Sequence, residues 1–146
     1  LQDGVLRQVI QELRGNPCLT EYSPDESRSL IRNLFKTRGV LAMVFDQGKN
    51  TKGNPVKLFG QNSTLFLRLP QLVNQMGAGI VTFRTYTKSN LRGKIVIRFE
   101  KYYPPGYDRT KKEAAPTLVE SIAREAENWI AEHPEQWSWN YHGNFR

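Results

Sequence analysis

Asp46 is the side chain best placed to take part in a reaction. It directly follows the apolar run at residues 40–45. A carboxylate fixed at the end of a rigid strand can orient an imidazole, bind a hydroxyl or pair with a cation. The alternative is an Asp whose side chain only satisfies the backbone of the following turn. Position alone leaves both interpretations open.

The polar loop at residues 46–55 contains two lysines on a backbone with two glycines. Lys49 and Lys52 are chemically suited to binding phosphate. The glycine spacing of a P-loop is missing, however, so an ordinary solvated loop is an equally good interpretation.

Metal sites and covalent nucleophiles are poorly supported. His133 and His142 have no cysteine or second histidine at the spacing of zinc ligands. Cys18 has no neighbouring base, and no Gly-x-Ser-x-Gly motif is present. We therefore expect no metal and no cofactor.

Composition points to one globular domain with anionic partners. The 146 residues are 38% hydrophobic, and the net charge is +7. Such a charge favours nucleic acid, a membrane surface, an acidic carrier protein or a phosphorylated substrate. The longest apolar run, at residues 40–45, is far shorter than the roughly 20 residues of a membrane-spanning helix. Any membrane contact is expected to be peripheral or to come from residues outside this chain.

The elements that must position these residues alternate between helix and strand. Apolar residues at helical spacing predict helices at residues 5–13, 24–38, 69–76 and 116–133. The second of these has a capping box from Ser23 to Glu26 and a stop at Gly39. Strands are expected at residues 40–45, 80–86 and 94–99. The first lacks alternation, as is typical of a parallel strand buried on both faces. The fold predicted is α/β, in three layers, with a central, mostly parallel sheet flanked by helices.

The two later strands carry cations interleaved with aromatic residues, which raises a nucleic-acid interpretation. The favoured alternative places the aromatic side chains in the core and the cations on a solvated face. The residues concerned are Arg84, Lys88, Arg92, Lys94 and Arg98, with Phe83, Tyr86 and Phe99.

Six blocks, in order along the chain, resemble the lipid A late acyltransferases of the lysophospholipid-acyltransferase-like superfamily. Residues 13–16 resemble an Arg-x-Asn segment, and residues 28–36 the helix after it. Residues 44–48 resemble a strand ending in Pro-Asp-Gln or Pro-Asp-His, with Phe45 in place of the Pro. Residues 56–60, 75–81 and 133–139 resemble the Val-Pro-Phe-Phe-Gly, Thr-Gly-Ala and Pro-Glu-Gln-aromatic-x-Trp blocks.

The resemblance implies transfer of a fatty acyl chain from acyl-carrier protein, or a related thioester, to a glycolipid or phospholipid acceptor. This would take place at the cytoplasmic face of the bacterial inner membrane, with no nucleic acid as partner. It assigns supporting catalytic roles to Asp46 and Arg14, which we expect to line one cleft. Gln47, Lys49 and Lys52 would bind substrate. The alternative is a non-catalytic basic α/β module that binds anionic lipid or nucleic acid.

Besides Phe45 in place of the Pro, two features of the chain depart from the family pattern. The closing His-Arg-Arg-aromatic segment is replaced by residues 140–146. The family's general base is a His followed after four residues by Asp or Glu, and no such motif occurs in this chain. Residues 1–146 are therefore expected to form a single domain that is the C-terminal half of a larger acyltransferase domain. Its first strands would precede Leu1.

Overall fold

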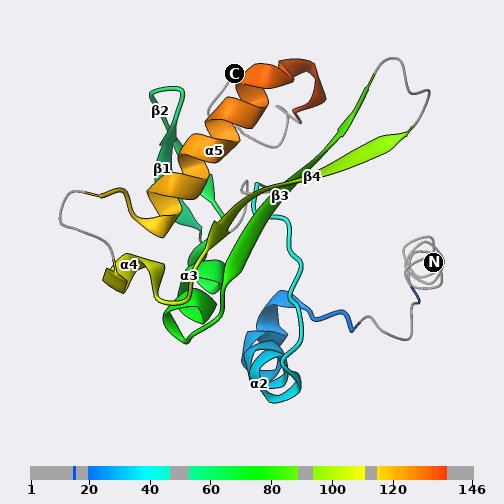
Figure 1. The fold of residues 1–146 in the computed structure, drawn as a ribbon, viewed down its shortest axis with the longest axis vertical. Coiled ribbons are helices and arrows are strands. Elements are labelled where there is room, and N and C mark those ends of the chain that lie inside the picture. The colour runs from blue at the N-terminus through cyan, green and yellow to red at the C-terminus, as the bar shows by residue number, and fades with distance from the viewer. Residues whose placement is uncertain (1–14, 16–19, 47–52, 89–93, 111–114, 138–146) are drawn as a thin grey trace. The chain divides into compact units, whose positions relative to one another are not determined.

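The computed structural model describes residues 15, 20–46, 53–88, 94–110 and 115–137 (Figure 1). The chain divides into two compact units, residues 1–42 and residues 43–146. Each unit is described below by itself. The helix predicted at residues 5–13 lies outside the described residues.

The first unit contains the short helix η1 (Pro24–Glu26) and the helix α2 (Ser27–Thr37). The predicted capping box is confirmed, because the backbone N–H of Ser23 donates to the Glu26 carboxylate at 2.9 Å. The helix ends one residue earlier than predicted. Arg38 takes the left-handed conformation at φ 52°, and the N–H of Gly39 donates to Leu34 O.

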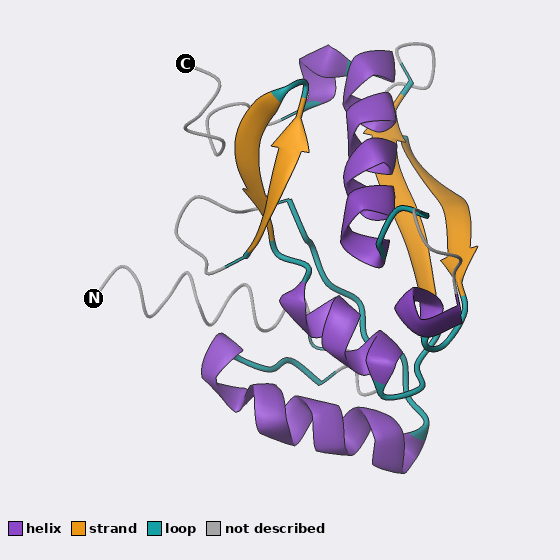
Figure 2. Cartoon of the chain, turned by 90° about the vertical axis from the view of Figure 1, so that its left-hand side faces the viewer, coloured by secondary structure: helices purple, strands orange, loops and turns teal. Residues whose placement is uncertain are grey.

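The second unit is organised around one helix, α5 (Leu118–Glu132), which lies between two β-hairpins (Figure 2). The hairpin on one side pairs β1 (Asn54–Leu58) with β2 (Gln61–Leu65). The hairpin on the other pairs β3 (Ile80–Thr87) with β4 (Ile95–Tyr103). The remaining elements are α3 (Arg68–Gln75), α4 (Tyr107–Thr110) and η3 (Pro134–Gln136).

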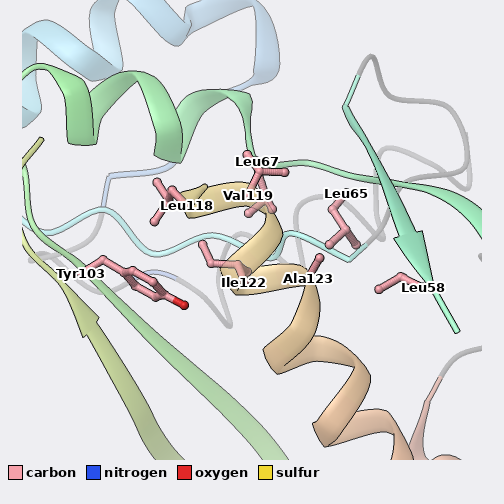
Figure 3. Packing of buried hydrophobic residues seen from close by; sticks show 8 residues of the cluster. All are labelled: Leu58, Leu65, Leu67, Tyr103, Leu118, Val119, Ile122 and Ala123. Carbon is pink, nitrogen blue, oxygen red and sulfur yellow. The ribbon is translucent and has the colours of Figure 1, made fainter. Parts of the chain in front are cut away.

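The core of this unit forms on both sides of α5. Tyr103 approaches the helix from the β3–β4 side, and Leu58 and Leu65 from the β1–β2 side (Figure 3). All three are fully buried. The helix contributes the residues whose spacing predicted an inward face, and each is buried: Leu118, Val119, Ile122, Ala123, Ala126 and Ile130.

The mixed α/β composition is confirmed, but the strand arrangement differs from the predicted one. Both described sheets are antiparallel and have two strands. No central, mostly parallel sheet is formed by the described residues. In β1–β2, Phe59 and Gly60 make the two-residue turn, with φ of 51° and 75°. Positive φ at both positions matches the right-handed twist of the flanking strands.

The prediction of a strand at residues 40–45 is wrong. These residues belong to no strand, and Val40 and Val44 are 97% and 62% exposed. A strand buried on both faces needs a partner strand and covering helices. Instead of pairing with a strand along its length, the segment is joined to the hairpin through Phe45, whose carbonyl accepts from Phe66 N–H at 2.7 Å.

The basic segment that follows the β3–β4 hairpin is partly regular. Strand β4 extends through Tyr103, and α4 forms a helical turn at residues 107–110. Asn74, only 1% exposed, holds this region to the end of α3. Its amide donates to Pro104 O at 2.8 Å and Ala78 O at 3.0 Å, and it accepts from Tyr107 N–H.

Candidate functional site

Asp46 is half-buried and lies at the end of a segment fixed by Phe45. The Phe45 ring meets the Trp129 ring of α5 edge-on, with the centroids 6.3 Å apart. Its carbonyl accepts from Phe66 N–H, just past β2. The aromatic residue that replaces the family's Pro therefore packs Asp46's segment against the β1–β2 hairpin and α5. This placement suits a carboxylate that acts from a fixed position.

The other predicted site residues lie outside the described residues. They are Arg14, Gln47, Lys49 and Lys52. The cleft predicted to hold both Asp46 and Arg14, and the contacts predicted for the two lysines, accordingly stay predictions.

The chain re-enters the described structure at Gly53, which is buried against β2. A Cβ at this position would overlap the carbonyl oxygen of Leu65 and the methyl group of Thr64. Only a glycine lets the backbone approach this closely. Gly53 therefore fixes the approach to β1 against the end of β2.

The turn of the same hairpin is held by α5. The backbone N–H of Phe59 donates to the Glu127 carboxylate. Residues 56–60, which resemble a family block, thus form β1 and a turn fixed to the helix. Their role in the described structure is architectural.

A second carboxylate of α5, Glu125, holds the other hairpin. Its two oxygens accept from Tyr103 OH at 2.6 Å and from Thr82 Oγ1 at 2.7 Å. The Lys101 ammonium is 4.0 Å from the carboxylate and 4.9 Å from the Tyr103 ring centroid. Burial, together with the hydrogen bond to Glu125, raises the pKa of Tyr103 well above its usual value.

Arg84 makes the third link between α5 and the β3–β4 hairpin. Its side chain is 9% exposed and pairs with Glu100 at 2.8 Å and with Glu132. Burial alone lowers the pKa of Arg84, but the hydrogen bond and charge of Glu132, with the charge of Glu100, outweigh it, so the net pKa is raised. The reciprocal hydrogen bond lowers the pKa of Glu132.

The Pro-Glu-Gln-aromatic-x-Trp block at residues 133–139, which we call the closing block, fastens the C-terminal end of α5 to the end of β3 through Gln136. Gln136 accepts from Thr87 N–H at 2.8 Å, and its amide donates to Thr87 O at 3.0 Å. His133 stacks on Tyr86 with the ring centroids 5.1 Å apart. Trp137 is half-buried. Trp139, the other indole of this block, lies outside the described residues.

A carboxylate outside α5 fixes the start of that helix. Asp108 accepts from Leu118 N–H at 2.8 Å and from Gln71 Nε2 at 3.4 Å. A carboxylate at a helix N-terminus satisfies an otherwise unbonded N–H and opposes the positive end of the helix dipole. Asp108 is therefore a structural carboxylate, unlike the role predicted for Asp46.

Three of the motif blocks thus contact α5 or follow it directly, through Phe45, Phe59 and Gln136. A family model described as bacterial lipid A biosynthesis acyltransferase matches residues 5–145. The chain belongs to this family. No curated protein and no solved structure gives a significant match. The family assignment confirms the resemblance drawn from the motif blocks and supports acyl transfer in lipid A biosynthesis.

None of the helices that the structure describes is both long enough and apolar enough to cross a membrane. Within the described ranges, no group of three or more His, Cys, Asp or Glu side chains is arranged to hold a metal ion.

Sequence reasoning did not find the Glu125, Glu127 and Gln136 contacts. A glutamate that bonds a distant hydroxyl or a turn N–H has the same local pattern as a solvated one. Gln136 was marked by the resemblance of its block to a family signature. That resemblance did not indicate which backbone groups its amide would bind.

Proposed function

We propose that this chain supplies part of an enzyme that transfers a fatty acyl chain from acyl-carrier protein to a hydroxyl of a lipid A-type glycolipid precursor. The observation that carries the proposal is the family match over residues 5–145. The net charge of +7 supports an acidic carrier protein as acyl donor and an anionic acceptor.

The proposed reaction is an acyl transfer by general-base catalysis. A histidine outside this chain takes the proton of the acceptor hydroxyl, and its paired carboxylate holds the required tautomer. The hydroxyl oxygen attacks the thioester carbonyl carbon, the carbon–sulfur bond breaks, and the proton passes to the leaving thiolate. No metal is needed for these steps.

The proposed roles of this chain's residues support that reaction. Arg14 neutralises acceptor phosphate or developing oxyanion charge. Asp46 orders the site by hydrogen bonding, from the position that Phe45 and Trp129 fix. Gln47, Lys49 and Lys52 bind the acceptor.

We also propose that the chain is the C-terminal part of a larger acyltransferase domain, at the cytoplasmic face of the inner membrane. In that domain the described hairpins would join a mostly parallel sheet. Each strand of β3–β4 has one edge that is unpaired among the described residues, which is compatible with extension of the sheet.

The experiment compares two aspartates in the complete enzyme. Asp46→Asn should lower kcat at least tenfold while the melting temperature stays within about 2 °C of the parent. Asp108→Asn is the matched control. It weakens the bond to Leu118 N–H, so it should lower stability by about 1 kcal/mol and leave specific activity near that of the parent.

Acyl transfer from acyl-carrier protein and thermal unfolding are measured for both variants. A large loss of stability with retained specific activity in Asp46→Asn would make Asp46 a structural turn residue. Equal turnover in parent and Asp46→Asn would remove it from the site.

A further inference from the structure

One face of the β3–β4 hairpin is apolar and exposed. Its six large side chains are between 39% and 71% exposed. They are Val81 and Phe83 on β3, and Ile95, Ile97, Phe99 and Tyr102 on β4. We call this set the outer face. Soluble proteins rarely leave an apolar patch of this kind uncovered unless it binds something.

The register of the hairpin makes the outer face continuous. Phe83 is paired with Phe99, and Val81 with Tyr102. The two Phe rings touch, with centroids 5.9 Å apart. A shift in register next to Phe83 keeps Tyr102 on the same face as Phe99.

The opposite face of the hairpin is the one used for packing. Thr82, Arg84 and Tyr86 meet Glu125, Glu132 and His133 of α5 and its C-terminal end. In Figure 2, α5 covers this face, and no described element of residues 53–137 covers the other. The structure therefore contradicts the expectation that Phe83 and Phe99 face the core.

The hairpin also carries most of the chain's excess positive charge. Residues 80–103 contain six lysines and arginines and one acid, Glu100. That acid is already paired with Arg84 at 2.8 Å and Arg98 at 3.2 Å. Lys88 and Lys94 are exposed where the two strands approach their connecting loop.

We propose that the outer face docks on an anionic phospholipid bilayer. Phe83, Ile97 and Phe99 enter the boundary between headgroups and acyl chains, and Lys88 and Lys94 contact lipid phosphates. Apolar side chains bordered by cations and a tyrosine match the layered polarity of a membrane interface. The aliphatic members favour lipid over nucleic acid, because they offer bases no ring to stack on.

This inference rests on the proposed function, since it would bring the enzyme to the surface that contains its acceptor. Its test is independent of catalysis. The full chain is mixed with vesicles of phosphatidylglycerol or of phosphatidylcholine, without acyl donor or glycolipid, and the bound fraction is measured by flotation. Loss of acyl transfer leaves this measurement unchanged, so the two proposals fail separately.

The key variant is Ile97→Thr with Phe99→Thr, because threonine keeps strand propensity while removing apolar surface. It should lower the partition coefficient on phosphatidylglycerol vesicles about tenfold or more. The matched control is Val40→Thr with Val44→Thr, which changes exposed apolar residues outside the hairpin and should bind like the parent. Circular dichroism checks that all forms are folded.

A second pair of variants tests the contribution of the lysines to vesicle binding. Lys88→Gln with Lys94→Gln should weaken binding about fivefold for each lysine removed. Lys36→Gln with Lys57→Gln, two exposed lysines elsewhere, is the control. In Phe99→Trp, quenching of the new indole by lipids with brominated acyl chains would place this position below the headgroups.

Four outcomes would overturn the proposal. The parent could fail to bind phosphatidylglycerol vesicles. The variant Ile97→Thr with Phe99→Thr could bind them as well as its control does. The outer face could mediate a dimer that Ile97→Thr with Phe99→Thr dissociates, with vesicle binding unchanged. Single-stranded nucleic acid could compete fully with vesicles and bind the chain more tightly than they do.

Discussion

Tyr103 shows at the residue scale how one buried hydrogen bond makes stability depend on pH. Its pKa is raised from the ordinary value of 10.0 by burial and by Glu125. In the unfolded chain Tyr103 ionises at about pH 10, but in the folded chain it stays protonated to a higher pH. Stability from this group is therefore complete below about pH 10 and is lost as the pH rises toward the folded value.

We expect Tyr103→Phe to lower the free energy of unfolding by about 1–3 kcal/mol near neutral pH, because Glu125 loses a buried donor. At about pH 11 Tyr103 is ionised in the unfolded parent but not in the folded one, which lowers the parent's free energy of unfolding. The difference in stability between parent and variant should therefore shrink. Urea unfolding at both pH values measures it. Tyr102→Phe, on the exposed face, should change little. A difference that stays constant with pH would contradict the argument.

Gln136 is the residue of the closing block whose contact is clearest. Its amide bonds both the N–H and the carbonyl of Thr87. Gln136→Ala should cost about 1–2 kcal/mol and speed amide hydrogen exchange at Thr87. Asn128→Ala, at an exposed position of α5, is the control. Unchanged exchange at Thr87 would show that this contact does not hold the end of β3.

At the element scale, the β1–β2 hairpin depends on the close approach at Gly53. Gly53→Ala places a methyl group against Leu65 O and the Thr64 side chain. We expect a loss of about 1–3 kcal/mol in unfolding free energy, as for other overpacked positions. Adding Thr64→Ala removes the side-chain overlap but not the backbone one, so it should restore little. Full rescue by Thr64→Ala would show that the backbone is not the obstacle.

The elements that sequence predicted best are those specified by local signals. For α5, an apolar stripe together with a stop at Pro134 gave the buried face residue by residue. The strand at residues 40–45 failed because burial on two faces depends on partners that the segment itself does not encode. The β1–β2 hairpin was missed because its turn is Phe59-Gly60, whereas Asn-Gly is the usual signal for positive φ.

For the whole molecule, the sequence predicted the family but only part of the site. The family followed from six blocks in the right order, because an ordered set of motifs is more specific than any one of them. Asp46 was predicted to follow a rigid strand, whereas it follows an extended segment that Phe45 fixes. No periodicity could show that Phe83 and Phe99 would face outward, because alternation defines two faces and not which one is covered.

The last prediction concerns the activity of residues 1–146 alone. The family's His-x4-Asp/Glu pair is absent from this chain, and general-base assistance contributes typically about 10²–10⁴-fold. His133 does not supply this motif, because Ser138 occupies the position where the paired Asp or Glu would stand, and its ring stacks on Tyr86 with the centroids 5.1 Å apart. The chain, incubated with acyl-carrier protein and a lipid A precursor, should therefore give no more product than the reaction without protein. The assay has a sharp control in His133→Gln, which should behave like the parent. Turnover that depends on His133 would show that the base lies in this chain and that the proposed division of the site is wrong.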